Sequence, residues 1–165
     1  MYDFKPDENL DPAERYRQLC SAADALTATE SDPIANMANI AALIWEFVPG
    51  LNWAGFYRLL ENDDGEGELV LGPFVGRPAC IRIPMGAGVC GTAAKTGETQ
   101  LVEDVHAFPG HIACDSASLS EVVVPVVRNG QVVAVIDLDS PEPVRFKPED
   151  AAGIEQLARL LADRI

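Results

Sequence analysis

Two valine-rich runs joined by Asn129-Gly130 place the strongest constraint on the fold of this chain. SEVVVPVV ends one residue before the dipeptide, and QVVAVIDLDS follows the dipeptide directly. Both turn residues tolerate the positive φ angles that a two-residue β turn requires. Asn-Gly between two β-branched runs therefore predicts a β-hairpin over residues 120–140.

The stretch before this hairpin, residues 108–115 (FPGHIACD), has neither a helical nor a strand period. A turn at Pro109-Gly110 is followed by a histidine, a cysteine and an aspartate within five residues. These residues and the acids of the hairpin are most of the potentially reactive side chains of the chain. We therefore interpret the region as the functional site. Its reactive side chains are His111, Cys114, Glu121, Asp137 and Asp139.

At 165 residues, the chain is long enough for one domain with a substantial core. Its 26 acidic and 12 basic side chains give a formal charge of -14, which repels nucleic acid and anionic membranes. No apolar run approaches the roughly 20 residues that span a bilayer, and the acidic N-terminus is unlike a signal peptide. We therefore expect a cytoplasmic protein, where disulfides are mostly transient and catalytic.

Helical spacing predicts a first helix over residues 11–28, and a second that begins at Ser31-Asp32-Pro33 and ends before Pro49-Gly50. Strands with hairpin-like links follow, and then a final helix. The expected fold is a single α+β domain over residues 1–165, an antiparallel sheet with helices packed on it. It comprises N-terminal helices (11–48), a sheet with active-site loops (52–140) and a C-terminal helix (148–165).

The four cysteines allow several kinds of chemistry. Cys20 lies among alanines in the first helix, where a small buried or half-buried thiol is the simplest interpretation. The other three follow Cys-x9-Cys-x23-Cys, which lacks the close Cys-x2–4-Cys pairs of structural zinc sites, even with His111 as a fourth ligand. Inert core thiols are another alternative, but Cys90 and Cys114 lie in glycine-, proline- and polar-rich loops, which favours reactivity. A short helix beginning near Gly91 would place Cys90 at a helix N-terminus, a setting that lowers a thiol pKa.

Asp137 and Asp139 are two residues apart on a strand and therefore share a face. Two carboxyls this close repel, so one pKa should rise unless a cation lies between them. They can hold a substrate ammonium or donate a proton; alternatively, they contact water at the frayed end of the strand. A regular hairpin pairs Glu121 with Leu138, on the opposite face. A one-residue bulge near Pro125 would bring Glu121 to the aspartates.

Trp53 and Tyr57 share one face of the first strand, and either wall a ligand pocket or serve as plain core aromatics. His111 has a similar ambiguity: it can orient or polarise the site, or brace a loop.

The segments NWAGFYRLL, LVLGPFVGRPACIRIPMGAGVCGTAA, VEDVHAFPGHIACDSASLSEVVVPV and VIDLDSP together resemble the free methionine-(R)-sulfoxide reductases, which are built on a GAF domain. The likeness runs from about Asn52 to Phe146. It implies a six-stranded antiparallel sheet flanked by helices, usually in a homodimer. The implied activity is thiol-dependent reduction of free L-methionine (R)-S-oxide, recycled by thioredoxin, without a cofactor or metal. Two departures are an acidic loop at Glu61–Glu68 that is long for the family, and Ala134 where glycine is expected.

The resemblance also implies roles for individual residues. Cys114 of HIACD looks like the nucleophile that becomes a sulfenic acid, Cys80 of RPAC like its main resolving partner, and Cys90 of GVCG like a second candidate. A sulfoxide sulfur is a poor electrophile until its oxygen is protonated, so a neutral carboxylic acid is needed, and Glu121 is our first choice. The implied substrate-binding residues are Asp137, Asp139, Trp53 and Tyr57. The rival interpretation is a GAF-type sensor that binds a cyclic nucleotide or a tetrapyrrole without catalysis.

Overall fold

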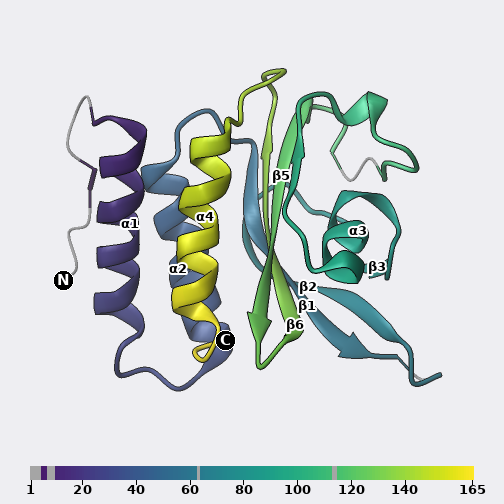
Figure 1. Ribbon diagram of the computed structural model, residues 1–165, viewed down its shortest axis with the longest axis horizontal. Coiled ribbons are helices and arrows are strands. Elements are labelled where there is room, and N and C mark those ends of the chain that lie inside the picture. Colours follow the sequence, from purple (N-terminus) through teal and green to yellow (C-terminus); the bar gives the residue numbers. More distant parts are fainter. Residues whose placement is uncertain (1–4, 7–9, 63, 113–114) are drawn as a thin grey trace.

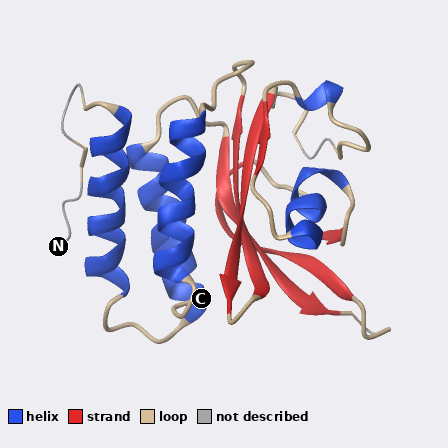
Figure 2. Cartoon of the chain, viewed as in Figure 1, coloured by secondary structure: helices blue, strands red, loops and turns tan. Residues whose placement is uncertain are grey.

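The computed structural model describes residues 5–6, 10–62, 64–112 and 115–165. A central sheet has helices on one side and loops around one short helix on the other (Figure 1). Figure 2 shows the long helices on one face of the sheet only. Among the described residues, no helix is long and apolar enough to cross a membrane. The helices are α1 (Pro12–Thr27), α2 (Pro33–Phe47), α3 (Gly88–Thr96) and α4 (Pro148–Leu161), with a 3-10 turn, η1, at Val105–Ala107. On the helical side, α2 and α4 pack against the sheet and α1 packs outside them.

The helix boundaries follow from capping residues that are visible in the sequence. Asp11 accepts a hydrogen bond from the Glu14 amide at 3.0 Å, and Asp32 accepts one from the Ala35 amide at 2.8 Å. Each capping aspartate precedes a proline at the first helical position, where the missing N–H carries no penalty. The predicted starts of α1 and α2 are confirmed. α4 begins at Pro148 as predicted, but ends at Leu161 rather than at Ile165.

The described strands form one six-stranded antiparallel sheet, which confirms the predicted fold, and their order is β3-β2-β1-β6-β5-β4. The sheet separates two apolar clusters, one against the long helices and one against α3. β1, β6 and β5 are neighbours in this order. Alternate residues of these three strands therefore point to the face that packs against α3. The strands are β1 (Trp53–Glu61), β2 (Gly67–Gly76), β3 (Arg82–Pro84), β4 (Gln100–Val102), β5 (Ser120–Arg128) and β6 (Gln131–Ser140).

The β5–β6 hairpin has the predicted Asn-Gly turn and the predicted irregularity. Asn129 and Gly130 have φ angles of 53° and 79°. The register then shifts between Val126 and Val127, and skips Val133 on the opposite strand. The bulge is therefore close to Pro125, with its extra residue on β6, and it brings Glu121 opposite Asp139 rather than Leu138.

Two serines fix the strand ends beside these acids. The Ser140 hydroxyl donates to the carbonyl of Gly50 at 2.6 Å, and the Ser120 hydroxyl donates to the carbonyl of Glu142, also at 2.6 Å. Both serines are buried. Each serine immediately neighbours an acid in the chain, and β5 and β6 stay paired as far as Ser120 and Ser140. The strand end is therefore not frayed, with Asp137 buried and Asp139 half-buried.

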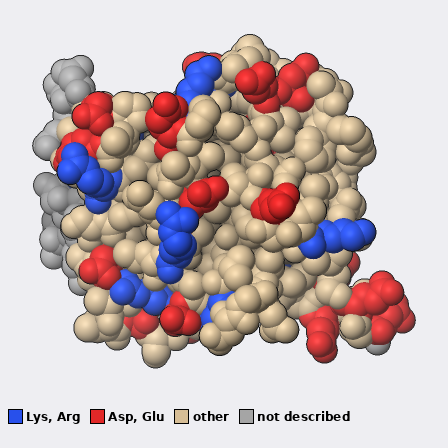
Figure 3. All heavy atoms as spheres, viewed as in Figure 1, with Lys and Arg blue, Asp and Glu red and all other residues tan. Residues whose placement is uncertain are grey.

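The surface in Figure 3 carries acidic and basic side chains in scattered groups. The clearest acidic group lies at the lower right, at the tip of the β1–β2 hairpin, where Glu61, Asp64 and Glu66 are exposed. This tip belongs to the long acidic loop noted in the sequence. It projects away from the region described next.

Candidate active site

A pocket lies on the face of the sheet opposite the long helices. Its floor is formed by β1, β5 and β6, and it is covered by α3, by residues 78–79 and by the segment that contains His111. The hollow measures about 520 Å³, including its open mouth. Hydrophobic, aromatic and acidic side chains all line it, and this mixture is typical of a site for a small amphipathic ligand.

One wall of the pocket is aromatic. Trp53 stacks between Tyr57 and Phe74, with ring-centroid separations of 5.9 and 5.3 Å. Gly55 lies between Trp53 and Tyr57 on the same face, and a Cβ there would come within 2.7 Å of the Trp53 ring. The missing side chain at Gly55 thus makes room for the indole. Trp53 and Tyr57 both line the pocket and also belong to the apolar cluster against α3.

The three predicted acids meet in this pocket. Asp139 and Asp137 on β6 are opposite Trp53 and Gly55 of β1, and Asp139 is also opposite Glu121 of β5. Glu121 and Asp137 are each only 6% exposed. The register shift at Val133 is what makes this convergence possible.

Burial raises the pKa of all three acids. The pKa of Asp137 rises to about 7, through burial, against the opposing effect of hydrogen bonds with Cys90 and Glu121. The pKa of Glu121 rises well above its ordinary value through burial and the neighbouring Asp137 and Asp139 charges. Burial and Asp137 likewise raise the pKa of Asp139, although a hydrogen bond with Ser118 acts against them. The site therefore holds protons near neutrality.

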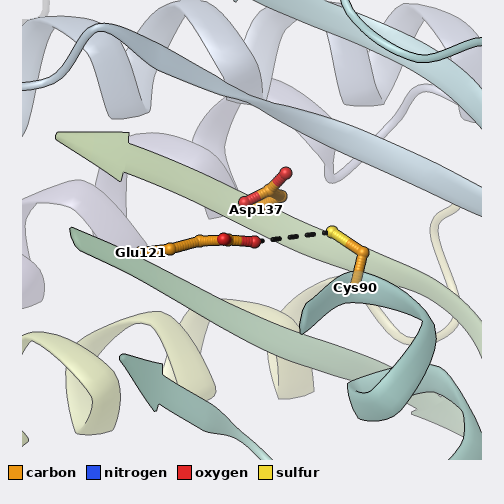
Figure 4. Close-up of side chains that lie close together, drawn as sticks. All are labelled: Cys90, Glu121 and Asp137. Carbon is orange, nitrogen blue, oxygen red and sulfur yellow. Dashed lines mark hydrogen bonds between the residues drawn. The ribbon is translucent and has the colours of Figure 1, made fainter. Parts of the chain in front are cut away.

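Cys90 is the described thiol that contacts these acids. It lies in the first turn of α3, and its Sγ is 4.0 Å from Glu121 Oε1 (Figure 4). The prediction that a helix N-terminus would lower its pKa is wrong. Burial raises the pKa of Cys90 well above its ordinary value, and the charges of Asp137 and Glu121 add to this effect, so desolvation outweighs the helix dipole.

The other cysteines have distinct environments. Cys20 carries a free thiol, is half-buried on α1 and packs against the helix-side core, which confirms the simplest interpretation of it. Cys80 is half-buried and disulfide-bonded, and it packs against the cluster that surrounds the pocket. Cys114, the predicted nucleophile, lies outside the described residues, so its role stays a prediction.

His111 lines the pocket beside Glu121. Its Nε2 lies 4.0 Å from Glu121 Oε2, and its ring meets that of the exposed His106 edge-on at a centroid distance of 6.5 Å. Burial, followed by the His106 charge, lowers the pKa of His111. The imidazole is therefore neutral near pH 7 and is able to accept or donate a hydrogen bond at the edge of the acid cluster.

Three further polar residues border the pocket, and their arrangement was not predicted. The Asn52 amide donates to Ser118 Oγ at 3.0 Å and to Asp115 Oδ2 at 3.3 Å. These bonds attach the segment before β5 to the start of β1. Position was the only available signal: Asn52 directly precedes Trp53, and Ser118 lies two residues before β5.

Comparison with known proteins gives a consistent result. Residues 35–165 match the GAF domain family. The chain is 49% identical over 152 residues to the free methionine-R-sulfoxide reductase of Escherichia coli, covering 92% of this chain and 89% of that one. It is 42% identical over 158 residues to the Saccharomyces cerevisiae protein of the same name, covering 93% and 87%. It superimposes with a TM-score of 0.91, at 43% identity and with 99% and 95% coverage, on the X-ray structure of free methionine-R-sulfoxide reductase from Neisseria meningitidis in complex with its substrate.

Proposed function

The chain belongs to the free methionine-R-sulfoxide reductase family of GAF-domain proteins, and from this membership we propose that it reduces free L-methionine (R)-S-oxide to L-methionine. The observation that carries the proposal is the buried meeting of Glu121, Asp137 and Asp139 beside a thiol and an aromatic wall. Sulfoxide reduction needs a proton donor, an ammonium-binding site and an apolar surface for the methyl-sulfinyl end. The acids and the aromatic rings that line the pocket are side chains suited to these three roles.

In this mechanism, Glu121 supplies the proton. Protonation of the sulfoxide oxygen turns its sulfur into an electrophile, and an acid that is neutral at pH 7 is the suitable donor. The burial of Glu121 and its raised pKa support this role. The substrate ammonium would provide a positively charged partner for Asp137 and Asp139. Asp137 Oδ1 is buried without a hydrogen-bond partner among the described residues, which fits an unfilled ammonium contact.

The remainder of the substrate fits the pocket walls. The stacked Trp53 and Tyr57 offer an apolar surface for the methyl-sulfinyl end. Backbone amides of the segment from Gly110 onward would bind the carboxylate. A pocket that holds both a free ammonium and a free carboxylate leaves no exit for a polypeptide chain, so the substrate is the free amino acid.

We assign the nucleophile to Cys114. Its thiolate attacks the protonated sulfoxide, and the hydroxyl group passes from the substrate sulfur to the cysteine sulfur. The substrate S–O bond breaks as the Cys S–O bond forms, so that methionine leaves with the electron pair and the enzyme holds Cys–SOH. A second thiol then expels water and forms a disulfide, which a dithiol reductant of the thioredoxin type reduces. The disulfide at Cys80 supports that residue as the main resolving cysteine. Cys90, buried and with a raised pKa, is the slower candidate because little of it is thiolate. A cytoplasmic homodimer completes the proposal.

A thioredoxin-coupled assay of NADPH oxidation tests this function directly. Four substrates are compared: the free (R)- and (S)-sulfoxides of methionine, and both epimers within a peptide. We expect turnover of the free (R)-epimer alone. Comparable activity on an oxidised protein or peptide would contradict the proposal.

A further inference from the structure

Cys90, Glu121 and Asp137 form a compact set of metal-binding side chains on the pocket floor. One ligand atom from each lies within 4.8 Å of the other two. Figure 4 shows the three groups converging from separate elements: Cys90 from α3, Glu121 from β5 and Asp137 from β6. All three are buried. The set is therefore different in kind from a solvated group of surface acids.

A second observation is that one carboxylate oxygen of this set lacks a hydrogen-bond partner among the described residues. Asp137 Oδ1 is buried and has no hydrogen-bond partner among the described residues, although Asp137 as a whole is only 6% exposed. A buried carboxylate oxygen is stable when it is paired, protonated or bound to a metal. His111 Nε2 lies 4.0 Å from Glu121 Oε2, at the edge of this set and outside the three mutually close ligand atoms.

From this geometry we propose that the pocket binds one Zn²⁺ ion through Cys90, Glu121 and Asp137, and that the ion excludes the amino-acid substrate. Thiolate, imidazole and carboxylate are the ligands that Zn²⁺ takes in proteins, whereas Mg²⁺ favours six oxygens. A tetrahedral zinc ion separates a thiolate sulfur from a carboxylate oxygen by roughly 3.5 Å. The 4.0 Å between Cys90 Sγ and Glu121 Oε1 is thus about half an ångström too long, a shift within reach of side-chain rotation.

This ligand set differs from the structural zinc site that the sequence argued against. That site would have needed Cys80, which is disulfide-bonded here, whereas Cys90 has a free thiol. The new set uses acids that the proposed reaction also needs, because Glu121 is the proton donor and Asp137 receives the ammonium. Exclusion of substrate therefore rests on the proposed function, but binding of the ion does not.

Ion binding should be strongly pH-dependent. The titratable groups that line the pocket are Cys90 from α3, Glu121 from β5, Asp137 and Asp139 from β6, Tyr57 from β1, and His111 and Asp115 from the segment before β5. A thiol or a carboxyl must lose its proton to bind zinc, so binding should release protons and tighten as the pH rises.

The test uses the full chain without reductant, so that the Cys80 disulfide stays intact. All proteins carry Cys20→Ser, which removes the free thiol of α1 from the titration. Calorimetric titration with ZnCl₂ should give one ion per chain, and MgCl₂ should give no binding. Co²⁺ should produce the near-ultraviolet thiolate charge-transfer band. Cys90→Ser should abolish that band, and Asp137→Asn should weaken Zn²⁺ binding at least tenfold. Asp115→Asn, a pocket acid outside the set, is the matched control and should leave binding unchanged.

Folding of each variant is checked by circular dichroism, and Asp137→Asn decides the matter if Cys90→Ser does not fold. Absence of stoichiometric Zn²⁺ binding, or equal binding by Asp137→Asn and the parent, would overturn the site. Free L-methionine (R)-S-oxide should remove the Co²⁺ band, and persistence of the band at saturating sulfoxide would overturn the exclusion of substrate. Because the metal titrations need no turnover, failure of the reductase assay would leave their result intact.

Discussion

Glu121 and Asp139 are direct cross-strand partners in β5 and β6. The Asn129-Gly130 turn by itself would oppose Glu121 to Leu138, whose side chain packs in the helix-side core. Skipping Val133 changes the phase of the ladder between the turn and the acids. A single residue near the tip of the hairpin therefore decides that Glu121 faces the pocket.

Replacement of Glu121 with Gln should slow the chemical step by roughly 10²- to 10⁴-fold, the usual contribution of a general acid. The amide keeps the shape of the side chain but cannot donate a carboxyl proton. Single-turnover release of methionine from prereduced enzyme measures this step. Glu98→Gln, at an exposed position, is the matched control. A Glu121→Gln enzyme with a normal rate would remove Glu121 from the mechanism.

Asp139→Asn should mainly weaken substrate binding. Asp139 is part of the negative charge that faces the substrate ammonium, and the amide lacks that charge while keeping the ability to bond with Ser118. We expect KM to rise at least tenfold and kcat to change by less than threefold. Steady-state kinetics on the free (R)-sulfoxide separate the two parameters. A large fall in kcat at unchanged KM would instead indicate a role in proton transfer.

The cysteine variants should separate nucleophile from resolving residue. Cys114→Ser should form no sulfenic acid and release no methionine, because the attacking thiolate is missing. Cys80→Ser should complete one turnover and then stall, since only recycling by disulfide exchange is lost. Quantification of methionine per enzyme, with trapping of sulfenic acid, distinguishes the two. Cys20→Ser is the control, and full product from Cys114→Ser would show that another thiol attacks.

Stability should fall as the pH rises through the range in which the buried acids titrate. The pKa of Asp137 rises from its ordinary 3.8 to about 7 in the folded protein, so the folded state binds more protons than the unfolded state between these values. Its stabilising contribution is fully present below about pH 4 and is lost by about pH 7, with a slope on the order of 1.4 kcal/mol per pH unit for each proton. Urea titrations across this range measure the slope, and Asp137→Asn should reduce it. An unchanged slope in Asp137→Asn would mean that Asp137 is ionised throughout.

Gly55→Ala should destabilise the fold by about 1–3 kcal/mol through overpacking. A Cβ at this position would lie 2.4 Å from Phe74 Cβ, which is rigid because it belongs to the paired strand β2. Gly67→Ala is the control, since its Cβ would meet only the flexible ends of Leu59 and Met85. Urea unfolding measures both variants. Equal stabilities would show that β1 and β2 adjust freely.

The parts of this molecule that the sequence predicts are those determined by local interactions. Asn129-Gly130 specifies the hairpin, and the aspartate-proline pairs specify where α1 and α2 begin. The position of the register shift was only suspected from Pro125, because the extra residue is on the opposite strand. A ladder register depends on the packing of the whole sheet.

Electrostatic properties of the site were harder to predict for the same reason. The first turn of α3 suggested a low pKa for Cys90. Burial of the thiol reverses this direction, and the acids of β5 and β6, more than 30 residues away, add to the effect. The bonds from Asn52 to Asp115 and Ser118 also join distant segments. Such pairs follow from the assembled sheet, and a single sequence contains no local pattern for them.

Because Trp53 stacks against Tyr57 and Phe74 in the pocket wall, its intrinsic fluorescence can report on the pocket without an added label. The chain has two tryptophans, and the second, Trp45, is on the surface of α2 with 38% of its area exposed. A Trp45→Phe protein would have one emitting indole, buried in the pocket wall and sensitive to any molecule that displaces water beside it. Fluorescence would then report filling and emptying of the pocket in real time, including for ligands that undergo no reaction.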